Sequence, residues 1–228
     1  MLGLDYPLFR NQAAVMQSVQ RRIVRCPLFV QGVMPTNKIA AFVDKMHARY
    51  HVLLNDQERH VLRKAGFPAT FLAVHPSVEE PASFHWLLFS SAPLSGESLQ
   101  DARDARTRLT WRHYVLTENR YKRWTWKLRR EYRQGYEQRL LEAAKGRNTV
   151  RMNVLLEGLS KMPMFNGVRE DVRDLVRGAQ HIWGESRNAP RLHFFQRQPN
   201  WPESYPVMRP VVFHDDPPVT LGQYLEKL

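Results

Sequence analysis

Residues 69–90, ATFLAVHPSVEEPASFHWLLFS, contain two runs of β-branched and aromatic residues, 69–75 and 84–90, on either side of a turn-rich stretch. Such runs between turn-forming residues are typical of β-strands. Residues 24–33, 109–117 and 121–128 have the same character. Together, these five runs predict a sheet of about five strands, largely antiparallel.

Apolar residues at helical spacing surround these runs. Residues 14–23, 36–50 and 55–66 have one apolar stripe each, and Asn55 followed by Glu58 predicts a capping box at the start of the third segment. From Arg129 to Gly184 the period is again helical, with breaks that indicate three helices. We therefore predict an α+β fold in which helices cover the sheet and a C-terminal three-helix segment follows it.

The composition changes twice along the chain. We expect an α+β sheet domain over residues 1–128, a helical segment packed on it over 129–184, and an extended tail rich in proline and aromatic residues over 185–228. The tail keeps large aromatic side chains, among them Phe194, Phe195, Trp201, Tyr205 and Phe213, which is more than a free linker needs. We expect it to lie across the domain surface, so that all three parts form one compact unit.

The single cysteine, Cys26, has no partner for an internal disulfide, and no apolar stretch approaches the roughly 20 residues that span a bilayer. These features predict a cytoplasmic protein with no membrane partner. No cofactor is expected. His47 and His51 have a spacing that suits zinc, but no third ligand is evident, and we predict no metal site.

Basic residues dominate the charge. The chain has 34 Lys and Arg against 22 Asp and Glu, a formal net charge of +12, and residues 103–151 alone contain 15 basic and 5 acidic residues. A guanidinium suits phosphate oxygens, and an excess of this size favours polyanions. We therefore expect DNA or RNA as the partner, the alternative being a solvated basic face.

The predicted strand 121–128 alternates in a way that suits this role. Lys122, Trp124, Trp126 and Leu128 share one face, and Arg123, Thr125 and Lys127 share the other, which we expect to be the outer face. The predicted phosphate-binding residues are Arg112, Arg120, Lys122, Arg123, Lys127, Arg129, Arg130 and Arg133.

A second set of residues suggests catalysis. Phe84-His85-Trp86 lies in a predicted strand, and Tyr132 and Tyr136 lie four residues apart on a later helix. This order resembles the HUH family of replication initiators and relaxases, in which a His-hydrophobe-His strand holds a divalent metal and a helical tyrosine attacks DNA phosphate. The resemblance implies His85, Tyr132 and Tyr136 as catalytic residues and a divalent metal as their cofactor. Ser83 stands where the first histidine of the motif belongs.

Residues 99–126, LQDARDARTRLTWRHYVLTENRYKRWTW, also resemble uncharacterised proteins carried on plasmids and integrative elements of Gram-negative bacteria. That resemblance implies a mobile-element context and no particular reaction.

Three hypotheses stay open at this point. The first is a non-catalytic nucleic-acid-binding protein that uses the Arg-rich surface. The second is a strand-cleaving enzyme, either HUH-like or ribonuclease-like, the latter with His85 as general base. The third is a subunit of a larger nucleoprotein assembly that binds other proteins through residues 185–228.

Overall fold

The computed structural model describes residues 2–9, 11–77, 80, 82–184 and 219–228, and the chain forms an α+β fold with antiparallel sheets. Two compact units divide the chain between Leu109 and Thr110. The first unit also includes the described end of the chain, residues 219–228. The division does not coincide with the predicted boundary after residue 128, because the last predicted strand packs with the helices that follow it.

The first unit is built on a four-stranded sheet with the order β3-β4-β2-β5. Its strands are β2 (Leu28–Pro35), β3 (Thr70–Pro76), β4 (Ser83–Ser90) and the short β5 (Gln100–Asp101). All neighbouring pairs are antiparallel. The two runs that flank the turn-rich stretch therefore form the predicted antiparallel pair, β3 and β4.

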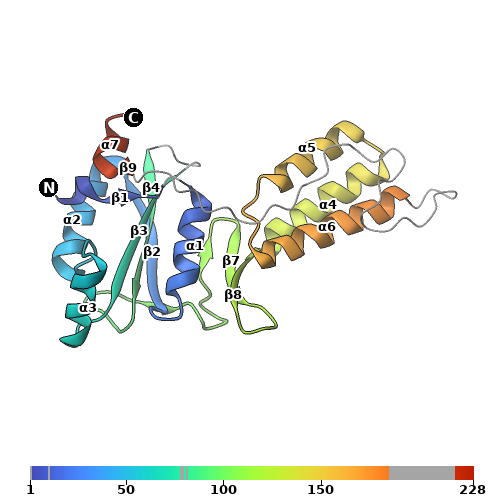
Figure 1. Ribbon diagram of the computed structural model, residues 1–228. Coiled ribbons are helices and arrows are strands. Elements are labelled where there is room, and N and C mark those ends of the chain that lie inside the picture. The colour runs from blue at the N-terminus through green and yellow to red at the C-terminus, as the bar shows by residue number, and fades with distance from the viewer. Residues whose placement is uncertain (1, 10, 78–79, 81, 185–218) are drawn as a thin grey trace. The chain divides into compact units, whose positions relative to one another are not determined.

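Helices cover both faces of this sheet (Figure 1). The helix α2 (Ile39–Tyr50), which follows a short 3-10 turn η2 (Thr36–Lys38), packs its apolar stripe against Leu72, Phe84 and Leu88. On the opposite face α1 (Gln12–Arg22) lies close to β3, and the Arg22 guanidinium sits 3.8 Å from the centroid of the Phe71 ring.

The third predicted helix of this part of the chain also forms, as α3 (Asp56–Lys64). Asn55 and Glu58 make the predicted capping box at its start.

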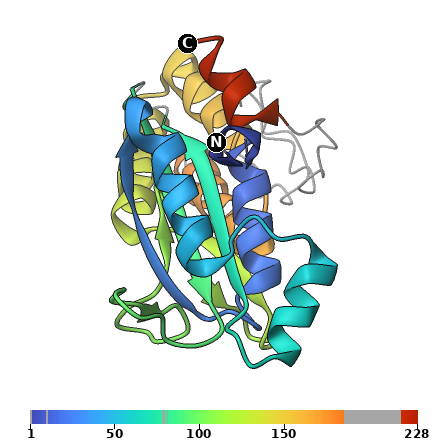
Figure 2. The same ribbon diagram turned by 90° about the vertical axis from the view of Figure 1, so that its left-hand side faces the viewer.

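The two ends of the described chain meet in the first unit (Figure 2). After the 3-10 turn η1 (Leu2–Asp5), the strand β1 (Pro7–Leu8) pairs with β9 (Val219–Thr220), and the helix α7 (Leu221–Leu225) follows. Leu221 is fully buried, and its backbone N–H donates to the Tyr6 carbonyl over 2.8 Å.

These contacts revise the prediction for the tail. Residues 219–228 belong to the first unit, whereas residues 185–218, the bulk of the predicted extended tail, lie outside the described residues.

The second unit combines a three-stranded sheet with three helices. Its strands are β6 (Thr110–Trp111), β7 (Tyr114–Glu118) and β8 (Trp124–Leu128), in that order. The predicted three-helix segment is confirmed as α4 (Arg130–Lys145), α5 (Thr149–Ser160) and α6 (Asn166–Gly184), and α6 packs on β8.

The prediction of a single sheet was therefore wrong. The runs at 24–33, 69–75 and 84–90 contribute β2, β3 and β4 to one sheet, whereas the run at 109–117 is divided into β6 and β7 and joins β8 in another. No helix among the described residues is long and apolar enough to cross a membrane.

Candidate nucleic-acid interface

A tight turn joins β7 to β8 and contains residues 119–123, NRYKR. The Asn119 Oδ1 atom accepts hydrogen bonds from the backbone N–H of Tyr121, over 2.9 Å, and of Arg123, over 3.0 Å. Lys122 adopts a left-handed backbone conformation with φ of 58°. Tyr121 therefore lies in the turn and not in the strand, which begins at Trp124 instead of the predicted position 121.

The side chains of this turn point into solvent. Tyr121 is 65% exposed, and the Arg120 guanidinium carbon lies 4.7 Å from the centroid of its ring. Lys122 and Arg123 are also exposed. Within the described part of the chain, no carboxylate forms an ion pair with any of these three cations. We call Arg120, Tyr121, Lys122 and Arg123 the hairpin tip.

Three of the other predicted phosphate-binding residues lie beside acidic side chains. The ion pairs are Lys127 with Glu170 at 3.8 Å, Arg129 with Glu131 at 3.8 Å, and Arg133 with Asp171 at 3.7 Å. Each acid reduces the positive potential that the cation presents to a phosphate. Among the described residues these three cations thus have a carboxylate within 4 Å, whereas the three cations of the hairpin tip do not.

The remaining two predicted residues lie at the other end of the β7-β8 hairpin, where Tyr114 pairs with Leu128. Arg130 is the exposed first residue of α4. Arg112 occupies the two-residue loop between β6 and β7 with φ of 51°, and its carbonyl accepts a hydrogen bond of 3.5 Å from Arg129 Nη1.

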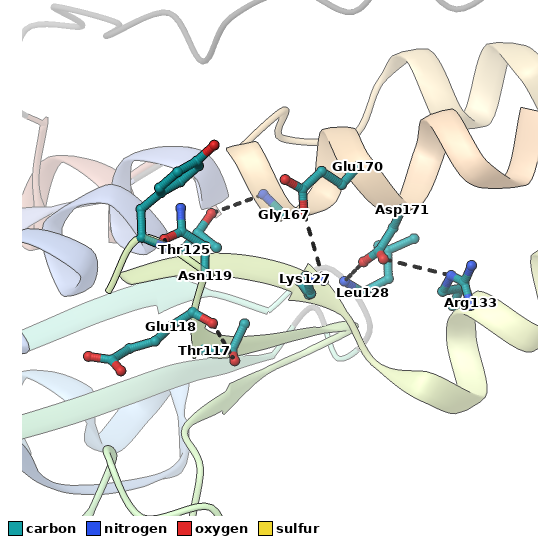
Figure 3. A network of polar contacts seen from close by, with 11 residues as sticks. Thr117, Glu118, Asn119, Thr125, Lys127, Leu128, Arg133, Gly167, Glu170 and Asp171 are labelled. Carbon is teal, nitrogen blue, oxygen red and sulfur yellow. Dashed lines mark hydrogen bonds and ion pairs between the residues drawn. The ribbon is translucent and has the colours of Figure 1, made fainter. Parts of the chain in front are cut away.

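Polar contacts fasten β8 to the start of α6 (Figure 3). The Gly167 backbone N–H donates to Thr125 Oγ1 over 3.0 Å, and the Leu128 backbone N–H donates to Asp171 Oδ2 over 2.9 Å. Thr125 is consequently 2% exposed, so the face of this strand that was predicted to be the outer one is covered at its centre. The hairpin tip thus extends from the strand β8, which pairs with β7 and is hydrogen-bonded to α6.

Burial raises the pKa of the Asp171 carboxyl above its usual value, although the Leu128 N–H and the nearby Lys127 and Arg133 act in the opposite direction. We therefore expect the Asp171 side chain to stabilise the fold mainly as the hydrogen-bond acceptor of the Leu128 N–H, and less through its charge. A buried backbone N–H that loses its acceptor is costly.

Asp171→Ala is expected to lower the free energy of unfolding by about 2 kcal/mol, because it leaves the Leu128 N–H without an acceptor. Asp171→Asn keeps a side-chain oxygen for that N–H and is expected to cost less than about 1 kcal/mol. Urea denaturation and hydrogen–deuterium exchange of the β8 backbone measure the two effects. Equal losses in both variants would show that the charge and not the acceptor matters.

The two predicted catalytic tyrosines contact each other and pack within the second unit. The rings of Tyr132 and Tyr136 are 5.2 Å apart, and Tyr132 stacks in parallel on His113 with 4.0 Å between the ring centroids. An ideal Cβ built on Gly158, in α5, would lie 2.8 Å from the Tyr136 hydroxyl. Both side chains therefore join α4 to its neighbours.

Burial, together with the neighbouring Tyr136, raises the pKa of the Tyr132 hydroxyl to about 12. A tyrosine nucleophile has to lose its proton before or during attack. This environment favours the protonated phenol and does not activate it.

His85 belongs to the first unit, whereas Tyr132 and Tyr136 belong to the second. It lies on β4 opposite His75 of β3, and the two histidines share one face of the sheet. Ser83, at the position of the first motif histidine, uses its hydroxyl to donate to the Glu80 carbonyl over 3.0 Å. Among the described residues no three His, Cys, Asp or Glu side chains are placed to hold a metal ion together.

Comparison of the chain with protein-family models, curated proteins and solved structures found no match. The assignment of a function therefore rests on the geometry of the chain itself.

Sequence reasoning missed three residues that shape this region. Tyr121 was assigned to a strand, Asp171 was not singled out, and His113 was not linked to Tyr132. Asn119 ahead of a run of polar residues is a signal that could have placed Tyr121 in a turn. No local signal reports the other two contacts, because each joins segments that are far apart in the sequence.

Proposed function

We propose that this protein binds the phosphate backbone of DNA or RNA through the hairpin tip, with the other predicted cations of the second unit as a supporting surface. The observation that carries the proposal is the group of three exposed cations, Arg120, Lys122 and Arg123, that have no carboxylate partner among the described residues. When such a group neutralises phosphates, it releases the small cations that were condensed on the nucleic acid, and this release drives binding.

The backbone supports the same proposal. Arg112 and Lys122 both have positive φ, a conformation that favours glycine or asparagine. A long cationic side chain has no local conformational advantage at either position. Its presence in both hairpin loops fits a role for the charge itself.

The ion-paired cations contribute as a second layer. Lys127 and Arg129 are 40% and 47% exposed at the side chain, and their acidic partners are more exposed still. Exposed ion pairs of this kind are worth about 0–1 kcal/mol each. A polyanion can therefore displace the acids and engage these cations once the hairpin tip has bound.

Replacing Arg120, Lys122 and Arg123 together with glutamine tests the proposal, because glutamine keeps an unbranched polar side chain and removes its charge. We expect at least a tenfold loss of affinity for a fluorescently labelled 20-nucleotide DNA or RNA strand. The slope of log affinity against log salt is expected to fall by about 2, since each single-strand phosphate contact contributes roughly 0.7. Fluorescence anisotropy across a salt series measures both quantities.

The matched control removes three charges elsewhere. Lys38, Lys45 and Lys64 are exposed residues of the first unit, and their replacement with glutamine changes the net charge by the same amount. We expect this control to change affinity by less than threefold. Equal losses in the two triple variants would show that net charge and not the hairpin tip is responsible, and no loss in either would end the proposal.

A further inference from the structure

We propose that Tyr121 stacks on an unpaired base, so that single-stranded nucleic acid is the preferred partner of the hairpin tip. This inference rests on the proposed function and adds a base contact to its phosphate contacts. It follows from the position of one aromatic ring among the three cations.

The ring of Tyr121 is available to a ligand. Its side chain is 65% exposed, whereas Trp126 two residues into β8 is fully buried. The Arg120 guanidinium carbon lies over one face of the ring, 4.7 Å from its centroid, and the proposed base would stack on the other face. An aromatic ring between a guanidinium and a base combines a cation–π contact with base stacking.

The cations beside Tyr121 are placed for the flanking phosphates. Arg120 precedes the tyrosine and Lys122 and Arg123 follow it, so positive charge lies on both sides of the ring along the turn. In a single strand each base is likewise flanked by a phosphate on either side. In a duplex the base faces are already stacked on one another and the ring has nothing to stack on.

The turn holds the ring in a defined place. The two Asn119 hydrogen bonds fix the backbone on either side of Lys122, and β7 and β8 pair over residues 114–118 and 124–128. Beyond them, Asp171 and Thr125 anchor β8 to α6. A contact surface that is ordered before binding loses less conformational entropy when the ligand arrives.

Tyr121→Ala tests the inference, with Tyr121→Trp as the variant that keeps an aromatic surface. Stacking on an aromatic side chain contributes about 1–3 kcal/mol per base, which corresponds to a loss of about fivefold to a hundredfold in affinity. We expect Tyr121→Ala to show this loss for single-stranded oligo(dT) and oligo(rU) of 20 nucleotides. The Trp variant is expected to bind at least as tightly as the natural chain, and both variants to bind a 20-base-pair duplex within twofold of it.

An abasic strand separates the base from the phosphates. It has the same phosphates as oligo(dT) but no bases, so the natural chain and Tyr121→Ala are expected to bind it equally and with the same salt slope. Comparison of oligo(dU) with oligo(rU), which have the same base, shows whether the sugar matters. Thermal melting of Tyr121→Ala checks that this exposed substitution leaves the fold intact.

The outcomes distinguish this inference from the proposed function. If Tyr121→Ala binds oligo(dT) and oligo(rU) as tightly as the natural chain while the triple glutamine variant loses affinity, the cations bind phosphate and the stacking contact is absent. If the natural chain prefers the duplex, the inference is likewise overturned. If the triple glutamine variant keeps its affinity, the proposed function itself fails.

Discussion

Leu221→Ala is expected to lower the free energy of unfolding of the first unit by about 2–5 kcal/mol. Leu221 is the first residue of α7, has no exposed surface, and lies in the same apolar core as Ile39, Leu72 and Phe84. Truncation to alanine removes buried methyl groups and leaves a cavity between α7 and the sheet. The loss of thermal stability and faster hydrogen–deuterium exchange in β1 and α2 measure the effect.

Leu228→Ala is the matched control for this substitution. Leu228 is 68% exposed, so the same chemical change there is expected to alter stability by less than about 0.5 kcal/mol. Similar effects at both positions would show that α7 is not part of the core. Deletions designed to test the tail as a protein-binding element should therefore end before Val219 and spare β9 and α7.

Gly167→Ala is expected to destabilise the second unit by about 3 kcal/mol, near the upper end of overpacking effects. A Cβ on Gly167 would lie 2.5 Å from the Trp126 carbonyl oxygen, which is backbone and cannot move aside alone. The added methyl group would therefore separate α6 from β8 and weaken the hydrogen bond from the Gly167 N–H to Thr125. Urea denaturation and hydrogen–deuterium exchange of residues 124–128 report the change.

Gly178 lies on the same helix and provides the control. A Cβ there meets nothing within 4 Å, and the residue is exposed. Gly178→Ala is expected to stabilise α6 by up to about 1 kcal/mol, because alanine is the better helix former. A stabilising effect at both positions would mean that α6 does not approach β8 as closely as described.

Most local elements of this fold could be predicted from the sequence, because their signals are local. The runs at 69–75 and 84–90 became β3 and β4, the capping box at Asn55 and Glu58 formed, and the change of period at Arg129 marked the start of the helices α4 to α6. The division of the predicted strands between two separate sheets could not be predicted. Strand runs show which residues are extended, and they do not show which strands pair.

In the candidate site, too, local features could be predicted from the sequence and long-range contacts could not. Charge clustering pointed to residues 103–151, and the exposed cations of the hairpin tip lie within that range. The sequence could not show that Lys127 and Arg133 sit next to Glu170 and Asp171, since those acids come from a helix more than 35 positions later in the chain. The alternating pattern of residues 121–128 was also misleading at Thr125, because a strand can be covered on both faces.

The pairing of β1 with β9 has a consequence for synthesis. A ribosome delivers Thr110 to Gly184 in one continuous stretch, whereas the first unit receives β9 and α7 only after the second unit has been made. We expect the second unit to reach its native state while the nascent first unit still lacks the partner of Pro7 and Leu8 and the side chain of Leu221. N-terminal domains usually fold first during translation, and this chain is expected to reverse that order.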